Sequence, residues 1–294
     1  MTDLFDGFEL RMIETDEVTL RVRVGGSGPG LLLLHGHPQT HLMWRHVAPT
    51  LAEHFTVVLP DLRGYGDSTA PAETADHGQA SRRAMARDNV QLMSTLGFNR
   101  FAVTGHDRGG RVAYRMALDH PDRVARMAVL DIVPTGEVLG RLTVEVARAY
   151  AGWFFLGQPT PVPEMVVGQN PAAVYFGGKE ELFHPDALAD YLRCVSRPET
   201  IHTMCEDQRA AFSFDRAVDD ADVGQRRIAC PTLALWATDD DMGRLFDVLP
   251  IWRDWADDVT GQPIDASHYL AEENPADVLA ALTPFLLGPS NASV

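Results

Sequence analysis

Short apolar segments of strand length recur along the first 135 residues, and polar segments of helical character lie between them. The segments at 31–34, 55–60, 101–104 and 126–130 are apolar almost throughout, whereas residues 18–25 alternate between apolar and polar side chains. Such alternation is typical of a half-exposed antiparallel strand, and continuous apolar runs are typical of strands buried on both faces. With helices expected at 43–53, 81–95 and 108–118, the pattern predicts an α/β fold with a mostly parallel sheet.

The pattern changes after Pro134, because residues 136–224 contain helical patterns, aromatic side chains and prolines but no buried-strand pattern. Strand patterns return at 232–236 and 263–265, and a closing helix is expected at 275–287. We therefore predict a core formed by 1–135 and 225–294 and a helical cap formed by 136–224. A cap inserted at this point would lie over the carboxyl ends of the strands, where open α/β sheets bind their ligands.

The segment Gly105-His106-Asp107-Arg108-Gly109 lies between an expected strand and an expected helix. A strand, a small-x-nucleophile-x-small turn and a helix form the nucleophile elbow of the α/β-hydrolase fold, which is the fold class that we predict. Glycines at both ends permit the sharp turn because they lack a Cβ. The central carboxylate of Asp107 is ionised at neutral pH and can attack carbon directly, forming an ester. The alternative is that Asp107 only caps the following helix.

A general base is expected near the C-terminus, because the chain order in this fold is nucleophile, acid, base. Of the eleven histidines, His268 has the best placement, between the last expected strand and the last expected helix. His35, His37 and His106 lie near the elbow and are expected to have structural or backbone roles. We predict that His268 activates the water that hydrolyses the ester.

Two places in the chain can supply the acid that orients His268. One is Asp131, which ends the strand at 126–130, and the other is the run of aspartates after the strand at 232–236: Asp239, Asp240 and Asp241. Either location can reach the histidine in this architecture. The oxyanion hole is expected to consist of the backbone N–H groups of His37 and Arg108.

The formal net charge of −16 argues against nucleic-acid and anionic-membrane partners, which require a basic surface. An anionic substrate would therefore need cations at the site itself. Arg108 follows the nucleophile directly, and Arg111 lies one helical turn beyond it, so both point to the same neighbourhood. We predict that they bind a small carboxylate. The alternative is that Arg111 pairs with a structural Asp or Glu.

The chain resembles the haloacetate dehalogenases, which include the fluoroacetate dehalogenases. The resemblance is carried by HGHPQ at 35–39, DLRGYGDS at 61–68, GHDRGGRVAYRM at 105–116, VLDIVPT at 129–135 and WFFLGQP at 153–159. It implies that Asp107 displaces halide from a 2-haloacid and that His268 drives hydrolysis of the ester, so that a haloacetate yields glycolate plus halide. It also implies Asp131 as the acid, Arg108 and Arg111 as ligands of the substrate carboxylate, and Trp153 as a donor to the departing halide.

Two positions depart from the fluoride-handling members of that family. Gly152 stands where they have a histidine, and Gln208 stands where they have a tyrosine that contacts the halide. Fluoride is a poor leaving group and needs several donors as charge develops on it. We therefore predict a halide pocket of Trp153, Gly152 and Gln208 that turns over chloro- and bromoacetate better than fluoroacetate. The missing histidine side chain should also enlarge the pocket, which leaves longer 2-haloacids or an unrelated substrate as alternatives.

An epoxide hydrolase is the alternative function, because such enzymes use the same Asp and His together with two tyrosines from the cap. Tyr150, Tyr175 and Tyr191 could supply those tyrosines. Paired arginines suit a neutral epoxide less well than a carboxylate. An esterase would need Ser or Cys at position 107, and a haloalkane dehalogenase usually has Trp at position 108. A binding module that retains ligand without turnover is disfavoured by the presence of both Asp107 and His268.

The remaining sequence features exclude several classes of protein. Cys194, Cys205 and Cys230 show neither metal-ligand spacing nor a disulfide framework, and we expect no metal and no cofactor. No apolar run approaches the roughly 20 residues that span a bilayer. The N-terminal residues show no signal-peptide pattern, so a cytoplasmic protein is expected. If the chain self-associates, a homodimer is the default expectation.

Overall fold

The computed structural model describes residues 4–288, and within them eight strands form one sheet in the order β1-β2-β4-β3-β5-β6-β7-β8. The strands β1 and β2 are antiparallel to their neighbours, and all pairs from β4 to β8 are parallel. The bounds are β1 Glu9–Glu14, β2 Thr19–Gly26, β3 Gly30–Leu34, β4 Thr56–Pro60, β5 Phe101–His106, β6 Val124–Leu130, β7 Thr232–Ala237 and β8 Val259–Ile264. The mostly parallel α/β sheet predicted from the pattern is therefore confirmed.

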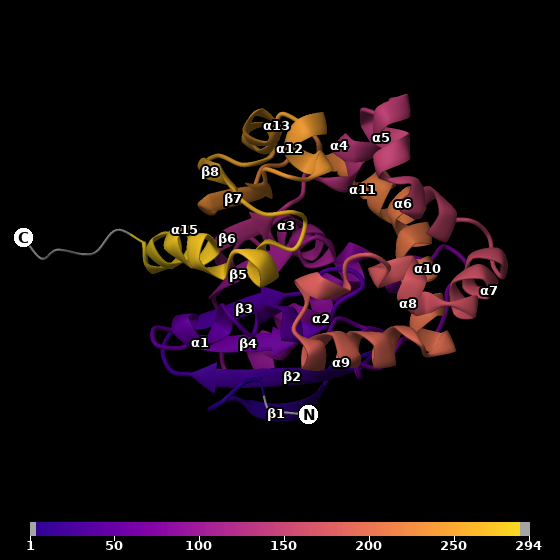
Figure 1. Cartoon of the computed structure of the whole chain (residues 1–294). Coiled ribbons are helices and arrows are strands. Elements are labelled where there is room, and N and C mark those ends of the chain that lie inside the picture. The colour runs from indigo at the N-terminus through magenta and orange to yellow at the C-terminus, as the bar shows by residue number, and fades with distance from the viewer. Residues whose placement is uncertain (1–3, 289–294) are drawn as a thin grey trace, which may run out of the picture.

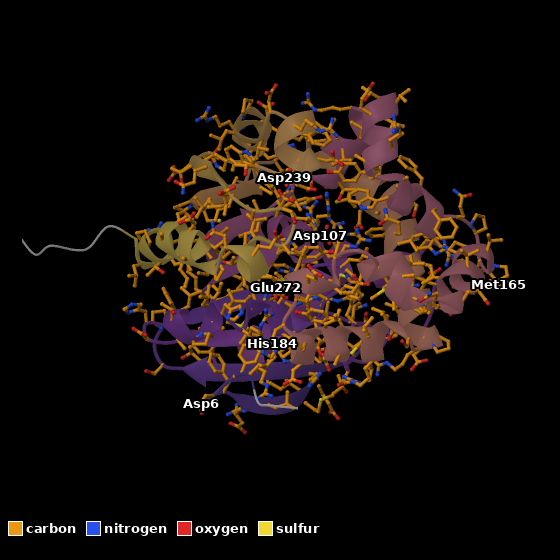
Figure 2. All side chains as sticks on the ribbon, viewed as in Figure 1. Asp6, Asp107, Met165, His184, Asp239 and Glu272 are labelled. Carbon is orange, nitrogen blue, oxygen red and sulfur yellow. The ribbon has the colours of Figure 1, made fainter. Side chains whose placement is uncertain are left out.

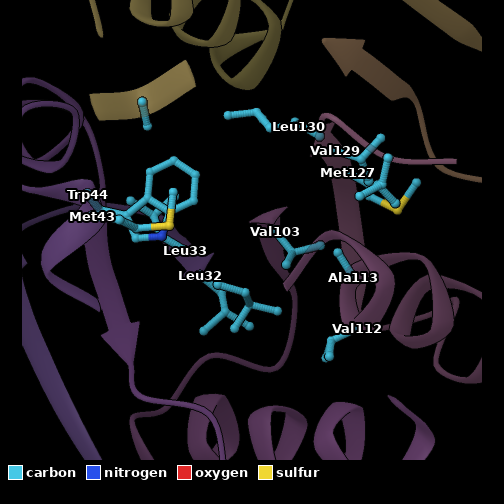
Figure 3. Packing of buried hydrophobic residues seen from close by; sticks show 14 of the residues in the cluster. Leu32, Leu33, Met43, Trp44, Val103, Val112, Ala113, Met127, Val129 and Leu130 are labelled. Carbon is cyan, nitrogen blue, oxygen red and sulfur yellow. The ribbon is translucent and has the colours of Figure 1, made fainter. Parts of the chain in front are cut away.

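The strands with continuous apolar runs form the centre of the sheet. Every residue of β3 and β5 is buried, and Figure 3 shows how side chains such as Leu32, Val103 and Val129 from neighbouring strands pack into one cluster. Each fully buried Leu or Val contributes about 1.5–3 kcal/mol, which is why these segments are strands in the interior. The helices α2 Arg82–Thr95 and α3 Arg108–Asp119 pack against one another, and α3 also contacts β5 and β6.

The expectations differ from the structure mainly at the two edges of the sheet. The first strand, β1, is almost entirely exposed and gave no apolar signal. The last strand, β8, begins at Val259 rather than at 263 and is also largely exposed. Pro263 lies within it, which an edge strand tolerates because the missing N–H is not needed for pairing. The closing helix α15, Pro275–Leu287, has the predicted bounds.

The predicted helix at 43–53 is wrong in detail. The structure has a 3₁₀ turn, η1 His41–Trp44, followed by a short helix, α1 Ala48–Leu51. Pro49 explains the break, because it lacks the N–H that a continuous helix would need for its hydrogen bond to the preceding turn. The proline is accommodated in the first turn of α1, where no backbone N–H is needed for a helical hydrogen bond.

Helices fill the segment between β6 and β7, and Figure 1 shows most of them gathered at one side of the sheet. We call this group, α4 to α11, the inserted helices. Their bounds are α4 Thr135–Gly140, α5 Val144–Ala149, α6 Ala151–Leu156, α7 Val162–Gln169, α8 Pro171–Phe176, η3 Glu180–Leu182, α9 Pro185–Val195, α10 Pro198–Ala210, the π-helical turn η4 Ala211–Asp215 and α11 Arg216–Asp222. After β7 follow α12 Asp241–Leu245, α13 Val248–Trp255 and α14 Leu270–Glu273. Within residues 4–288, no helix is both long enough and apolar enough to cross a membrane.

Candidate active site

The turn between β5 and α3 holds Asp107 in a backbone conformation that few residues adopt, with φ 43° and ψ −111°. The flanking glycines make this turn possible. A Cβ on Gly105 would collide with the backbone of Gly109, and a Cβ on Gly109 would collide with the backbone of Leu34. Asp107 occupies the position before α3, but its side chain makes no capping hydrogen bond. The capping alternative therefore does not explain this carboxylate.

The Asp107 carboxylate points into the interior of the molecule, near its centre in Figure 2, and the residue is 7% exposed. Its Oδ1 accepts a hydrogen bond of 2.9 Å from the backbone N–H of His37. Burial acts to raise the pKa of Asp107, but the charges of Arg108 and His268 outweigh it and hold this pKa well below its usual range. The carboxylate is therefore ionised at neutral pH. No hydrogen bond from the predicted second donor, the N–H of Arg108, to Asp107 appears among the described contacts.

The imidazole of His268 connects Asp107 with Asp131. Its Nδ1 donates to Oδ2 of Asp131 at 2.7 Å, and its Nε2 lies 4.0 Å from Oδ2 of Asp107. Asp131 is fixed in turn, because its Oδ1 accepts from the backbone N–H of Ala237 at 2.9 Å. Nε2 of His106 lies 2.7 Å from the backbone oxygen of His268, so His106 supports the loop that carries His268. The proton on Nδ1 leaves Nε2 of the neutral ring free to accept one.

A second carboxylate stands beside the same imidazole. Oδ2 of Asp240 lies 3.5 Å from Nδ1 of His268, farther than Asp131, while Asp239 is exposed. Of the two places that the sequence left open, the one at Asp131 makes the hydrogen bond. Burial disfavours the charged imidazole, but the hydrogen bond and charge of Asp131, together with Asp240, raise the pKa of His268 above its usual value.

The cluster of Asp131, Asp240 and His268 is also the place where a cation would find ligands, since three donor atoms lie within 4.8 Å of one another. The 2.7 Å hydrogen bond between His268 and Asp131 already satisfies two of those atoms. The arrangement is that of an acid–base pair with a neighbouring carboxylate.

The two arginines have different partners. The Nε of Arg108 donates to Asp207 at 2.6 Å and its Nη2 donates to Oε1 of Gln208, also at 2.6 Å. Asp207 lies on α10, is fully buried, and also accepts from Tyr65 and from Arg82. The charge of Arg108 is therefore neutralised within the protein. The structural-carboxylate alternative considered for Arg111 applies instead to Arg108.

Arg111 is equally buried but has no carboxylate within 4.0 Å among residues 4–288. Its Nη1 donates to the backbone oxygen of Val133 at 2.8 Å and to Thr135 at 3.2 Å, and its Nε has no hydrogen-bond partner in the described part of the chain. The indole of Trp153 covers it, with 4.5 Å between the guanidinium carbon and the ring centroid. A buried cation without a counterion is costly, which points to an anionic ligand.

These groups meet at a cavity of about 230 Å³. Its lining includes predicted residues from the sheet and from the inserted helices: Asp107, Asp131, His268, Arg111, Gly152 and Trp153. Arg108 and Gln208 do not line it, although Gln208 contacts Arg108 and its amide Nε2 is buried without a partner among the described residues. A Cβ added at Gly152 would meet no atom within 4 Å, so the absence of a side chain leaves open space there.

Two lining or supporting residues had not been singled out. Lys179 lines the cavity, as does Tyr150 from the epoxide-hydrolase alternative, and Asp207 pairs with Arg108. Lys179 carried a signal that could have been used, because it is the only lysine in the sequence. Asp207 gave no such signal, because its pairing with Arg108 spans 99 residues and has no local signature.

Comparison with known proteins agrees with this geometry. Residues 29–275 match the family model described as the alpha/beta hydrolase fold. A fluoroacetate dehalogenase of Burkholderia is 43% identical over 290 residues, covering 96% of this chain and 95% of its own. A soluble epoxide hydrolase of Corynebacterium is 32% identical, covering 88% and 91%. A solved structure from Nostoc, described as an alpha/beta hydrolase, is 48% identical with a TM-score of 0.92, covering 95% and 98%. The chain therefore belongs to the α/β-hydrolase family and, within it, to the group related to fluoroacetate dehalogenase that its motifs predicted.

Proposed function

We propose that this protein is a hydrolytic dehalogenase of small 2-haloacids, converting a haloacetate and water to glycolate, halide and a proton. The observation that carries the proposal is Arg111, a buried guanidinium beside the Asp107 carboxylate with no carboxylate partner among residues 4–288. Its cavity of about 230 Å³ suits a small molecule. The 43% identity to a fluoroacetate dehalogenase supports the same reaction class.

In the first step, the Oδ2 of Asp107 attacks the carbon that bears the halogen. The carbon–halogen bond breaks and its electron pair leaves with the halide, so that an ester joins Asp107 to the acid. Arg111 holds the substrate carboxylate in place, and the indole N–H of Trp153 donates to the departing halide. Arg108 supports this geometry from behind, through its pair with Asp207.

In the second step, water occupies the space between Nε2 of His268 and Oδ2 of Asp107, which are 4.0 Å apart. His268 takes a proton from this water while the oxygen adds to the Asp107 carbonyl carbon, and Asp131 stabilises the imidazolium that forms. The developing oxyanion is the Oδ1 atom, to which His37 already donates at 2.9 Å. Collapse of the intermediate breaks the ester bond, and the departing glycolate oxygen takes the proton from His268. The Asp107 carboxyl then loses its remaining proton to solvent, which restores the carboxylate and accounts for the proton that the reaction releases.

We further propose that chloro- and bromoacetate are better substrates than fluoroacetate. Trp153 lines the cavity, but Gly152 brings no donor and Gln208 accepts from Arg108 instead of lining the cavity. Fluoride leaves only when several donors stabilise it, and here the described residues offer the indole alone among the three predicted positions.

The second candidate is an epoxide hydrolase, favoured by the tyrosines near the site. Tyr150 lines the cavity, and the hydroxyl of Tyr175 is buried without a hydrogen-bond partner among the described residues. Tyr191, the third tyrosine considered, is not available because it donates to Glu272 at 2.7 Å. A neutral epoxide would leave Arg111 without a counterion, which is why we place this function second.

The experiment is a product assay on the purified protein with chloroacetate, bromoacetate, fluoroacetate and styrene oxide, alongside Asp107→Asn. We expect faster halide release from bromoacetate and chloroacetate than from fluoroacetate, and no diol from styrene oxide. We expect Asp107→Asn to lose turnover. Diol formation without halide release would reverse the order of the two functions. Faster turnover of fluoroacetate than of chloroacetate would overturn the halide preference while leaving the reaction class intact.

A further inference from the structure

The chain contains 24 arginines and a single lysine, Lys179, and this lysine lines the active-site cavity. It lies on the exposed segment between α8 and η3, after Gly177 and Gly178, the latter with φ +77°. Its Nζ is 5.6 Å from the centroid of the Tyr269 ring, which follows His268. The contact brings an inserted segment over the loop that carries the base.

The charges of the cavity are distributed unevenly with depth. At its floor, Asp107, Asp131 and Arg111 are buried, whereas the side chains of Asp240 and Asp241 are 31% and 37% exposed. An incoming anion therefore meets two carboxylates first, in a protein of net charge −16. Asp241 is paired with Arg244, so the charge of Asp240 is the main one that opposes the approach of a carboxylate-bearing substrate.

Lys179 is the exposed cation among the residues that line this cavity. No carboxylate lies within 4.0 Å of its Nζ in the described part of the chain, in contrast to most of the arginines, whose guanidinium groups are paired. A lysine is a compact point charge on a flexible stem, so it can accompany a mobile anion better than an arginine fixed by two hydrogen bonds.

We propose that Lys179 is the entry cation of this site, which draws a carboxylate-bearing substrate past Asp240 and Asp241 to Arg111. This inference rests on the proposed function, because it assumes an anionic substrate. Lys179 acts on capture of the substrate and not on the bonds that break, so its removal lowers kcat/KM and leaves kcat nearly unchanged.

The test compares Lys179→Gln, Lys179→Arg and Lys179→Glu in chloroacetate turnover at low and high ionic strength. At low salt we expect Lys179→Gln to lower kcat/KM roughly fivefold, the glutamate variant to lower it further, and the arginine variant to retain it. At about 0.5 M salt the differences should shrink to within about twofold, because the charge is screened. Arg253→Gln is the matched control, since it removes the same charge from an exposed residue outside the cavity.

The single lysine also permits a chemical test on the unmutated protein. Acetylation removes the charge of a lysine and reductive methylation keeps it. Acetylated wild type should behave as Lys179→Gln, and methylated wild type should behave as the untreated enzyme. Lys179→Arg has no lysine, so acetylation of this variant reports on the terminal amine alone and should change nothing.

The outcomes separate this inference from the proposed function. Absence of halide release by the wild type would overturn the proposed function and this inference together. If wild type releases halide, but Lys179→Gln and acetylated wild type have the same kcat/KM as untreated wild type at low salt, the entry role alone is overturned. If kcat falls equally in Lys179→Gln, in Lys179→Glu and in Arg253→Gln, the entry role of Lys179 is also contradicted.

Discussion

The sheet and the inserted helices contribute to one cavity in different ways. Residues after the strands are held by hydrogen bonds to backbone: Asp107 accepts from the N–H of His37, and Asp131 accepts from the N–H of Ala237. From the inserted helices, Trp153 and Lys179 reach the cavity through ring contacts, and Gly152 contributes open space. The difference suggests that the reaction depends on the sheet, while the choice of substrate depends on residues that can change without disturbing the fold.

Replacement of the proposed base tests the sheet side most severely. His268→Asn should lower steady-state turnover roughly 10²–10⁴-fold, the usual contribution of a general base. Asp107 needs no base for its attack, so one equivalent of halide should still be released and a carboxymethyl ester should accumulate on the protein. The size of the initial halide burst measures the first release, and the mass of the intact protein measures the ester. Continued turnover, or loss of the burst as well, would contradict the two-step scheme.

A pair of glycine substitutions compares the rigidity of the two regions. Gly105→Ala places a Cβ against the backbone of Gly109, and we expect a loss of about 3 kcal/mol or more, or failure to fold. Gly152→Ala meets nothing within 4 Å and lies within α6, so its stability should be unchanged or higher by up to about 1 kcal/mol. Chemical denaturation checks both values. Similar destabilisation by the two changes would remove the contrast.

The arginines provide the next comparison. Arg111→Gln should lower kcat/KM for chloroacetate roughly 100-fold, because a charge-assisted bond to the substrate carboxylate is lost. The melting temperature of Arg111→Gln should be unchanged, since the substitution breaks no internal ion pair of the described structure. Arg108→Gln should instead destabilise the fold, because Asp207 loses a buried partner. Equal kinetic and thermal effects of the two variants would mean that they act as one unit.

Restoring a side chain at position 152 tests substrate choice. Gly152→His should raise the ratio of fluoroacetate to chloroacetate turnover a few-fold, because a donor is added where the cavity is open. It should also exclude longer 2-haloacids. Gly168→His is the control: this glycine is exposed, also has nothing within 4 Å, and does not line the cavity. An unchanged halide ratio in Gly152→His would argue against a halide pocket at this position.

The smallest expected effect concerns Asp240. Ester hydrolysis needs neutral His268, so activity should fall as the pH drops through the raised pKa of His268. Asp240→Asn removes one of the three carboxylates that raise this pKa, so the acidic limb of the kcat profile should move to lower pH. The shift should be small, since Asp240 is partly exposed and its charge is screened by solvent. Asp239→Asn, at an exposed neighbouring position, should leave the profile in place. A shift to higher pH in Asp240→Asn would contradict the assignment.

Some features of this protein follow from the sequence by itself. Continuous apolar runs predict the central strands because burial on both faces requires them, and Gly105 and Gly109 predict the elbow because only glycine fits there. These signals are local, since they concern the conformation or burial of a few neighbouring residues. The edge strand β1 escaped prediction, and β8 was predicted only at its end, because both are largely exposed and show no such pattern.

Tertiary structure alone decided the charge arrangement at the site. Arg108 and Arg111 look equivalent in the sequence, yet Asp207, about 100 residues away on α10, neutralises one and leaves the other without a carboxylate partner among residues 4–288. The choice between Asp131 and Asp240 at His268, and the placement of Lys179 over Tyr269, depend equally on how distant segments pack. Pairings of this kind are set by the spatial arrangement of whole elements, and no local pattern of residues encodes them.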